Sequence, residues 1–524
     1  MLVYRSISRG ELDVNKLPQT PAQRTGRRAR RKKSSLVRRF WWKQVMCDAP
    51  GWWLAGLLVI APWAYGTTFP QTKELLAGAL LVLIGLFVIS RLIQRRWPKV
   101  HWLPAALTLI ILTQGWVMVL NPKLVYDSTV QYFHFVPTLI PWLPGTVDRG
   151  TSLDQMWLIT GLFGAFWAVN DLGADPEWRD RFWVIMSITG VSLVGLGLLQ
   201  RVTGAPGIFW RSDLDSGPTF FATYRYHANA GAFINISLLL TAARMICMFR
   251  RDHSNLVRSF WVLAFLGTLV SAFVNVSRAA TLIGLVALCC FLCWKWHERA
   301  RTNKVAFGWT RLTGFAIAGF LAAALLVWSV GFKDAYRHWA ELGKSLVSDG
   351  DGRFMLYGAI VRYIIPASGW WGFGAGTFHL IFPFFTNNLG TRLQGYWEYA
   401  HEDYLQTLVE WGFCGATAWF IFFGQTVARA TWTLGRRYRR WSGNTRRFAI
   451  ASLLALGTIL VHATVDFPMQ IASLQLYTAV LLGLVAASRQ GGERRLRRVR
   501  KLAEATGGQQ SDQEATLSQQ MSGR

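Results

Sequence analysis

Long apolar stretches recur along the chain between Trp52 and Ser488, separated by polar connectors. Each stretch holds roughly 16 to 22 residues, and a helix needs about 20 residues to cross a hydrocarbon core about 30 Å thick. Charged residues almost vanish from these stretches, which distinguishes them from the core helices of a large soluble protein. The pattern therefore predicts an all-α, polytopic membrane protein with about twelve transmembrane helices.

The expected spans divide the chain into a central membrane domain and two polar ends. The spans are 52–67, 75–93, 103–120, 153–170, 182–201, 228–249, 258–275, 279–296, 312–331, 405–428, 448–465 and 470–488. We expect a basic cytoplasmic arm over 1–51, a transmembrane domain over 52–488 and a basic, then polar, cytoplasmic tail over 489–524. The composition of both ends is typical of disordered segments.

Lys and Arg gather on every second connector, including 91–99, 250–258, 295–304 and 436–447. Cytoplasmic connectors of bacterial inner-membrane proteins carry this excess, so both termini are predicted to be cytoplasmic. The connector at 171–181 is the exception, because it holds four acidic and two basic residues.

The connectors expected on the outer side are those at 121–152, 202–227 and 332–404, and they are nearly neutral. The last is long enough to carry function or independent structure. Apolar residues recur at helical intervals over 353–366, which predicts an amphipathic helix at the membrane interface. The glycines of the following GWWGFGAGTFH favour tight turns, and a new helix is expected to begin near Ala400.

The formal net charge of +28 belongs mainly to residues beside the spans. Anionic membrane lipid attracts such positive segments, so the charge favours lipid over nucleic acid as a partner. The six cysteines lie in or near spans without the spacing of a zinc site. We therefore predict neither a metal site nor a disulfide framework.

Two arginines are candidates for binding an anion at the outer face. Arg278, in FVNVSRAATL, is placed at an outer connector, where a positive charge departs from the usual bias. It is either a fixed anion-binding group or an arginine that reaches lipid phosphate. Arg353 begins the interfacial helix, where backbone N–H groups also favour an anion, although a salt bridge with Asp349 or Asp351 is an alternative. The DGDG sequence before Arg353 lacks the spacing of a calcium loop.

His401, in EYAHEDYLQ, is a candidate general base at the junction of the outer loop and a membrane helix. Alternatively, it is only a polar cap. Glu398, one helical turn earlier, is better placed than Glu402 to orient it. Arg225 and His227, before the sixth span, are candidates for further substrate contacts or headgroup contacts. Glu398 and Glu402 are also possible substrate contacts. His462 and Asp466 are weaker candidates, since they could simply pair or cap helices.

The ordered motifs SRAATL, DGRFMLYGAIV, GWWGFGAGTF, AHEDYLQTLVEWGFCG and HATVDFPMQ resemble the O-antigen ligase and polymerase superfamily of bacterial envelope glycosyltransferases. The resemblance covers roughly residues 224–488. It implies a GT-C-like fold and a donor glycan on undecaprenyl pyrophosphate. It further implies that Arg278 and Arg353 bind the pyrophosphate and that His401 activates the acceptor hydroxyl. Glu402 departs from the family pattern, where Asn is common, and YRYHAN departs where Pro-Asn is commoner.

These residues predict glycan transfer to a hydroxyl acceptor without a metal or other cofactor, because guanidinium groups can stabilise the leaving pyrophosphate. The predicted outcome is inversion at the anomeric carbon. The acceptor could be a lipid A core, a growing polysaccharide or a protein. A polytopic transporter or flippase of lipid-linked glycans is the alternative, and a non-catalytic assembly scaffold is a third reading. The charged candidates cluster at the outer face rather than mid-membrane, which favours surface chemistry over transport.

Overall fold

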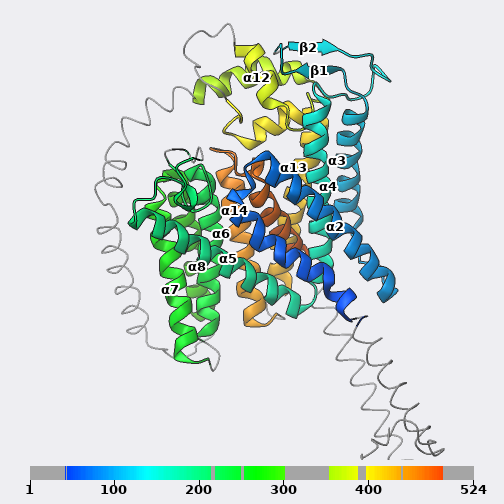
Figure 1. Cartoon of the computed structure of the whole chain (residues 1–524). Helices are drawn as coiled ribbons and strands as arrows, with labels where there is room; N and C mark the ends of the chain where they lie inside the picture. Colours follow the sequence, from blue (N-terminus) through cyan, green and yellow to red (C-terminus); the bar gives the residue numbers. More distant parts are fainter. Residues whose placement is uncertain are drawn as a thin grey trace, which may run out of the picture.

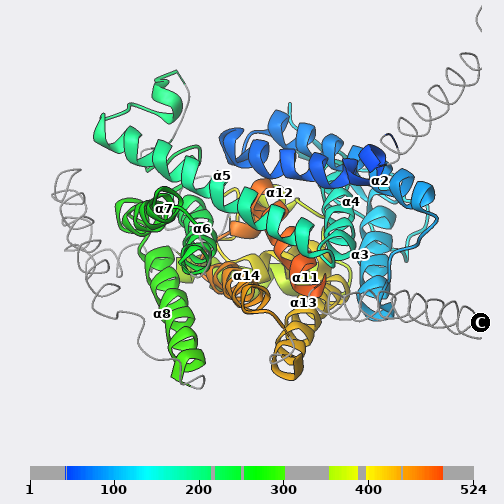
Figure 2. The same ribbon diagram turned by 90° about the horizontal axis from the view of Figure 1, so that it is seen from below.

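The long helices of the protein pack side by side as one bundle (Figures 1 and 2). The computed structural model describes residues 42, 44–130, 132–213, 217, 219–249, 253–300, 353–386, 397–437 and 441–487. The long helices are Gln44–Trp63, α2 (Pro70–Gln94), α3 (Trp102–Leu120), α4 (Arg149–Leu172), α5 (Pro176–Val202), α6 (His227–Met248), α7 (Asn255–Val274), α8 (Arg278–Ala300), α13 (Asp403–Arg437), α14 (Gly443–His462) and Ala472–Ala487.

Within the described residues, nine helices are long and apolar enough to cross a membrane, which confirms a polytopic helical membrane protein. Two other predicted spans are helical but fall short of those limits. Polar residues such as Gln155 and Asn170 lower the hydropathy of α4, and Ala472–Ala487 has fewer than 18 residues. The predicted span 312–331, like most of the two terminal segments, lies outside the described residues.

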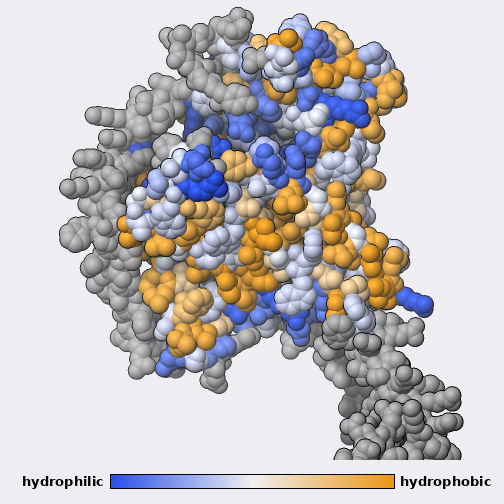
Figure 3. All heavy atoms as spheres, in the orientation of Figure 1, coloured by the Kyte–Doolittle hydropathy of each residue, from blue (hydrophilic) through white to orange (hydrophobic). Residues whose placement is uncertain are grey.

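A band of apolar residues crosses the middle of the bundle, with hydrophilic surface beyond it at both ends (Figure 3). Large apolar side chains point outward from the long helices, including Leu75 of α2, Leu109 of α3 and Leu263 of α7, which are 71%, 67% and 68% exposed. Apolar side chains so exposed on long helices are expected where lipid surrounds them.

The predicted outer connector 121–152 contains a β-hairpin, which adds one small sheet to the helical architecture. Strand β1 (Leu124–Asp127) pairs antiparallel with β2 (Tyr132–Phe135), with Leu124 opposite Phe135. The Asp127 carboxylate accepts a hydrogen bond from the N–H of Thr129 at 2.8 Å, a local bond that favours a turn over a helix. The hairpin and the short helix α12 (Phe378–Thr386) lie at the same end of the bundle (Figure 1).

At the opposite end of the bundle, ion pairs join neighbouring helices. These ion pairs explain why the connector at 171–181 is acidic, although the charge pattern predicts a basic one. Asp171, at the end of α4, binds Arg91 of α2 at 2.9 Å, and both side chains are buried. Asp180 of α5 binds Arg244 of α6 at 2.8 Å. The acidic residues therefore neutralise arginines from neighbouring helix ends instead of marking an outer connector.

Helix α6 lies at the centre of the bundle and is the most buried of the candidate spans. It approaches α8 closely because Gly231 faces Ala280, where an added Cβ would lie 2.4 Å from the alanine Cβ. Asn235 Nδ2 also donates to the Ala280 carbonyl at 2.9 Å. This packing fixes the start of α8, and hence Arg278, beside the start of α6.

Helix α13 is broken at Gly412, whose φ of 62° and ψ of −173° are accessible essentially to glycine alone. The glycine-rich segment after residue 368 supplies backbone partners for the broken turn. An added Cβ on Gly372 would lie 2.3 Å from the Glu410 carbonyl, so the two backbones meet with no room for a side chain. The joining bonds are Phe373 N to Val409 O at 3.1 Å, Gly374 N to Glu410 O at 2.9 Å, Phe413 N to Gly369 O at 3.2 Å and Cys414 N to Trp370 O at 3.0 Å.

Candidate active site

The helix predicted over 353–366 is present and positions Arg353, and its place at the membrane interface stays a prediction. Residues 353–368 are helical, with a π-helical turn at Ile360–Ile364 followed by α11 (Ile365–Ser368). Pro366 has no N–H to donate to the preceding turn, which accounts for the widened helix. One face of the helix is buried in a cluster with α12 and the start of α13, through Leu356 and Ile360.

His401 lies in a turn just before α13, with a left-handed φ of 51°. Its Nδ1 is 3.2 Å from Asp466 Oδ1, and Tyr357 donates its hydroxyl to the His401 carbonyl at 2.7 Å. The prediction that Glu398 orients His401 from one helical turn earlier is wrong. Residues 397–402 are not helical, and the carboxylate beside the imidazole comes from Asp466.

Arg353 is joined to the same carboxylate through a tyrosine. Its Nη1 donates to the Val465 carbonyl at 3.1 Å, and its Nη2 donates to the Tyr226 hydroxyl at 3.3 Å. Tyr226 donates in turn to Asp466 Oδ2 at 3.2 Å. Asp466 therefore holds His401 with one oxygen and the Tyr226–Arg353 pair with the other.

The electrostatics of this network favour an ionised Asp466. Burial alone would raise the pKa of Asp466, but its hydrogen bond with His401 and the nearby charge of Arg353 lower it below the usual value. Burial and the Asp466 charge raise the pKa of Tyr226, and burial raises the pKa of Tyr357 to about 12. Both tyrosines therefore remain neutral hydrogen-bond donors at neutral pH.

Aromatic side chains enclose the imidazole of His401. The rings of Phe467 and Trp397 approach it edge to face, with centroids at 4.8 Å and 5.5 Å. Tyr226 and Tyr399 both stack on Phe467, at 5.3 Å and 4.5 Å. The side chain of His401 is only 21% exposed, so the remaining access is through the cavity that it lines.

This cavity, which we call the outer cavity, has a volume of about 970 Å³ and lies where α2, α4 and α6 begin. Three of the predicted site residues line it, namely Arg225, Glu398 and His401. Tyr226 also lines it, and through Tyr226 the cavity reaches Arg353. The space is large enough for a sugar and a phosphate group, and its wall offers cations, carboxylates and aromatic rings together.

His227 and Arg278 lie beside this cavity wall rather than on it. His227 begins α6, and its Nδ1 is 2.9 Å from Thr219 Oγ1. Asn275 donates to the His227 carbonyl at 2.8 Å, which ties the residues before Arg278 to the start of α6. The guanidinium of Arg225 lies 5.4 Å from the ring of Phe69.

Glu402 has a structural role at the start of α13. Its carboxylate accepts a hydrogen bond from the Leu405 N–H, as in a helix N-cap. Burial raises its pKa. The carboxylate is therefore engaged by the helix, although it was predicted as a possible substrate contact.

The sequence singled out Asp466 only weakly and Tyr226 not at all. Both lie in motifs that were quoted, HATVDFPMQ and YRYHAN, but they are 240 residues apart and meet only in the folded chain. The outer cavity is also lined by Lys73, Asp154 and His379. Lys73 and Asp154 lie in no quoted motif, and His379 ends the quoted segment GWWGFGAGTFH but was not singled out. His462, predicted as a weak candidate, is fully buried, and neither of its ring nitrogens has a hydrogen-bond partner.

Within the parts of the chain that the structure describes, no group of three or more His, Cys, Asp or Glu side chains is placed to hold a metal ion. Arg353 is the cationic group joined to His401 through Asp466 and Tyr226, and Arg225 and Lys73 line the same cavity as His401. Arg353 uses two of its five N–H groups in the bonds described above, so others are available to an anion.

Comparison with known families gives a match over part of this chain. Residues 262–420 match the family described as O-antigen ligase, a segment that includes Arg278, Arg353 and His401. Comparison with curated protein sequences gives no significant match.

Proposed function

The O-antigen ligase domain at residues 262–420 makes this chain a membrane glycosyltransferase of that family, and we propose that it transfers a glycan from undecaprenyl pyrophosphate to a hydroxyl acceptor. The reaction would take place at the outer face of the bacterial inner membrane. The nine helices of the described residues that are long and apolar enough to cross a membrane, together with the charge pattern of the connectors, support this location.

One observation carries the proposal. His401 and Arg353, two residues 48 positions apart, are joined through Asp466 and Tyr226 at the wall of the outer cavity. Transfer from a pyrophosphate donor requires a base beside a fixed cation. The base takes the proton of the acceptor, and the cation stabilises the negative charge that develops on the leaving pyrophosphate.

His401 would act as the general base. Its Nδ1 is held by Asp466, which leaves Nε2 to take the proton of an acceptor hydroxyl. The acceptor oxygen then attacks the anomeric carbon as the bond from that carbon to the pyrophosphate oxygen breaks. In-line attack inverts the configuration at this carbon, and the ionised Asp466 stabilises the imidazolium that forms.

Arg353 and Arg278 would bind the pyrophosphate and stabilise the negative charge that develops on it. Arg353 is already fixed by Val465 and Tyr226, so little reorganisation is needed when the charge appears. Arg225, which lines the outer cavity, is a candidate for a further phosphate or sugar contact. No step in this scheme requires a metal or other cofactor.

The acceptor is a hydroxyl of a lipid A core, a growing polysaccharide or a similar molecule. His227 and Glu398, with the other polar groups around the outer cavity, are candidates for contacts to the sugars. Aromatic rings such as Trp397 and Tyr399 suit the apolar faces of sugar rings.

The central test replaces His401 by alanine in purified protein supplied with a lipid-linked glycan and an acceptor. Donor binding should persist while transfer falls by about 10²- to 10⁴-fold, the usual contribution of a positioned general base. Transfer and donor binding are measured separately, each with and without a chelator. Wild-type activity should not change on chelation.

Full activity of His401→Ala would contradict the base assignment, and loss of donor affinity alone would make His401 a binding residue. Loss of wild-type activity on chelation would contradict the metal-independent scheme. A flippase would move the lipid-linked glycan across vesicles without forming a new glycosidic bond, so the absence of product with intact donor movement would favour that alternative.

A further inference from the structure

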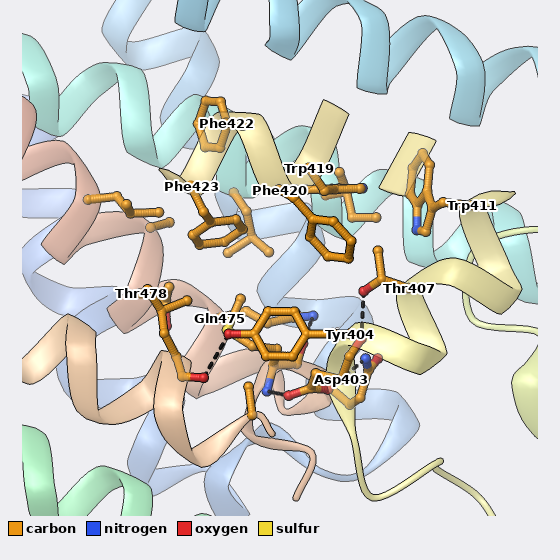
Figure 4. Close-up of a pocket in the computed structure, with 18 of the residues that line it drawn as sticks. Asp403, Tyr404, Thr407, Trp411, Trp419, Phe420, Phe422, Phe423, Gln475 and Thr478 are labelled. Carbon is orange, nitrogen blue, oxygen red and sulfur yellow. Dashed lines mark hydrogen bonds between the residues drawn. The ribbon is translucent and has the colours of Figure 1, made fainter. Parts of the chain in front are cut away.

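A second cavity lies deeper in the bundle, and we call it the α13 chamber. It has a volume of about 370 Å³ and is lined by α4, α13 and the helix Ala472–Ala487. Figure 4 shows aromatic residues of α13 gathered along one side of it, among them Trp419, Phe420, Phe422 and Phe423. Phe163 and Phe166 of α4 complete an apolar wall.

Three polar residues that line the chamber, Asp403, Tyr404 and Thr407, are already engaged within the protein (Figure 4). Tyr404 donates to the Leu460 carbonyl at 2.7 Å, and Thr407 donates to the Asp403 carbonyl at 2.7 Å. The Asp403 carboxylate accepts from Met469 N at 2.9 Å and from Gln470 Nε2 at 3.0 Å. These groups have little left to offer a sugar, so the chamber suits hydrocarbon.

The chamber adjoins the outer cavity. Gln155 and Gln470 line both spaces, so the two cavities share part of their walls. Asp403 also lines the chamber, and it lies two residues after His401. A ligand with one polar and one apolar part could therefore occupy both spaces.

The break in α13 shapes this chamber. Residues on both sides of Gly412 line it, from Asp403 to Gly424, so the chamber follows the helix from the outer cavity into the apolar bundle. Half-exposed Phe420 lies on its wall and also faces outward, at 37% exposure, which gives the chamber a side towards lipid.

We propose that the α13 chamber binds the first isoprenoid units of the lipid-linked donor. This inference rests on the proposed function. In such a donor the hydrocarbon chain is bonded directly to the pyrophosphate, so the apolar part must begin within a bond or two of the phosphates at the reaction centre. The acyl chains of a lipid A acceptor are separated from the reacting hydroxyl by several sugars, and they need no apolar chamber beside His401.

The first experiment labels the unmodified full-length protein. A donor that carries a photoactivatable diazirine on its first isoprene unit is bound, irradiated and located by peptide mapping. We expect labelled peptides from 155–166, 403–424 or 472–487, the three segments that line the chamber, and competition by unmodified undecaprenyl pyrophosphate. Labelling confined to other helices would overturn the inference.

The second experiment fills the chamber with Ala479→Trp. Ala479 lines the chamber and is 8% exposed, so an indole there would displace the ligand. The KM for the donor should rise by about tenfold or more, the loss expected when two buried methylene groups leave the chamber, while the KM for the acceptor stays unchanged. The matched control is Leu109→Trp, on the lipid-facing side of α3, where the side chain is 67% exposed.

An unchanged donor KM in an Ala479→Trp protein with wild-type thermal stability would overturn the chamber assignment. If that variant does not fold, the labelling of the wild-type protein decides. Wild-type protein that forms no product from the donor would refute the proposed function instead. Wild-type transfer with an unlabelled chamber refutes only this inference.

Discussion

At the scale of single residues, Asp466 is the centre of the candidate site because its two oxygens serve different partners. One oxygen meets His401 and the other meets Tyr226, which also accepts from Arg353. In the proposed reaction, this network links the group that would bind the leaving pyrophosphate to the group that would take the acceptor proton. The network predicts that changes at the arginine or the tyrosine alter both donor binding and proton transfer.

Replacing Arg353 by lysine should restore little of the activity lost in Arg353→Ala. The guanidinium reaches the Val465 carbonyl and the Tyr226 hydroxyl with separate nitrogens, whereas one ammonium cannot keep both bonds and also bind a phosphate. We expect transfer to fall by about 10²- to 10³-fold in both variants, as when one fixed donor to a developing anion is removed. The same loss is expected at Arg278.

The matched control for Arg353 is Arg362, which is exposed on the same interfacial helix. Steady-state transfer by Arg362→Lys and Arg362→Ala should equal that of the wild type. Near-normal turnover in both Arg353 variants would eliminate this donor site.

Tyr226→Phe should keep the ring stacked on Phe467 while removing both hydrogen bonds of the hydroxyl. The carboxylate of buried Asp466 then loses one hydrogen-bond donor, so the lowered pKa of Asp466 should rise. The acid-side fall of the pH–rate profile should therefore begin at higher pH. Loss of one hydrogen bond to a charged group predicts a decrease of roughly tenfold in kcat/KM.

The exposed Tyr363, on the interfacial helix, provides the control variant Tyr363→Phe. A purely structural role of Tyr226 would lower thermal stability without moving the pH profile. An unmoved profile in a stable Tyr226→Phe protein would contradict the coupling.

At the scale of helices, the broken α13 is the element that the sequence did not indicate. The apolar pattern predicted a continuous span from residue 405, and the glycines of GWWGFGAG were assigned to turns beside it. The turns are present, with positive φ at Gly372 and Gly374. These turns supply backbone hydrogen-bond partners for the break in α13. Only the folded structure shows this, because the two segments are about 40 residues apart in sequence.

Gly412→Ala should destabilise the protein and reduce transfer. The glycine has a φ of 62°, and an added Cβ would lie 2.5 Å from Gly372 N and from the Trp370 carbonyl. Backbone strain of this kind costs roughly 1–3 kcal/mol, and the steric contacts add to it. Gly435→Ala is the control in the same helix, since an added Cβ there meets nothing within 4 Å. Thermal unfolding in detergent compares the two, and equal midpoints would refute the importance of the break.

At the scale of the whole molecule, the sequence predicts the features that depend on hydrophobic periodicity and charge. It does not predict contacts between residues that are far apart in the chain. The boundaries of α3, predicted at 103–120 and observed at Trp102–Leu120, follow from hydropathy alone. The interfacial helix at 353–368 follows from helical periodicity. The Asp171–Arg91 pair and the Asp466–His401 pair join separate helix ends, so no local pattern could predict them.

The two ends of the bundle differ in chemistry, and this difference leads to a prediction about orientation. One end carries ion pairs between basic and acidic helix ends, such as Arg446 with Glu298 at 3.0 Å, and the basic connectors. The other carries the outer cavity, the β-hairpin and α12. Since Lys and Arg favour the cytoplasmic side, we expect the first end to be cytoplasmic and the second to face outward.

Single cysteines introduced into a cysteine-free background test this orientation in intact spheroplasts. An impermeant maleimide should label Phe384→Cys, in the exposed part of α12, without permeabilisation. Ser442→Cys, at the N-cap of α14, should react only after the membrane is opened, because its connector is basic. Labelling of Ser442→Cys but not Phe384→Cys in intact spheroplasts would reverse the topology. It would also place His401 and the outer cavity in the cytoplasm, on the wrong side for a reaction at the outer face.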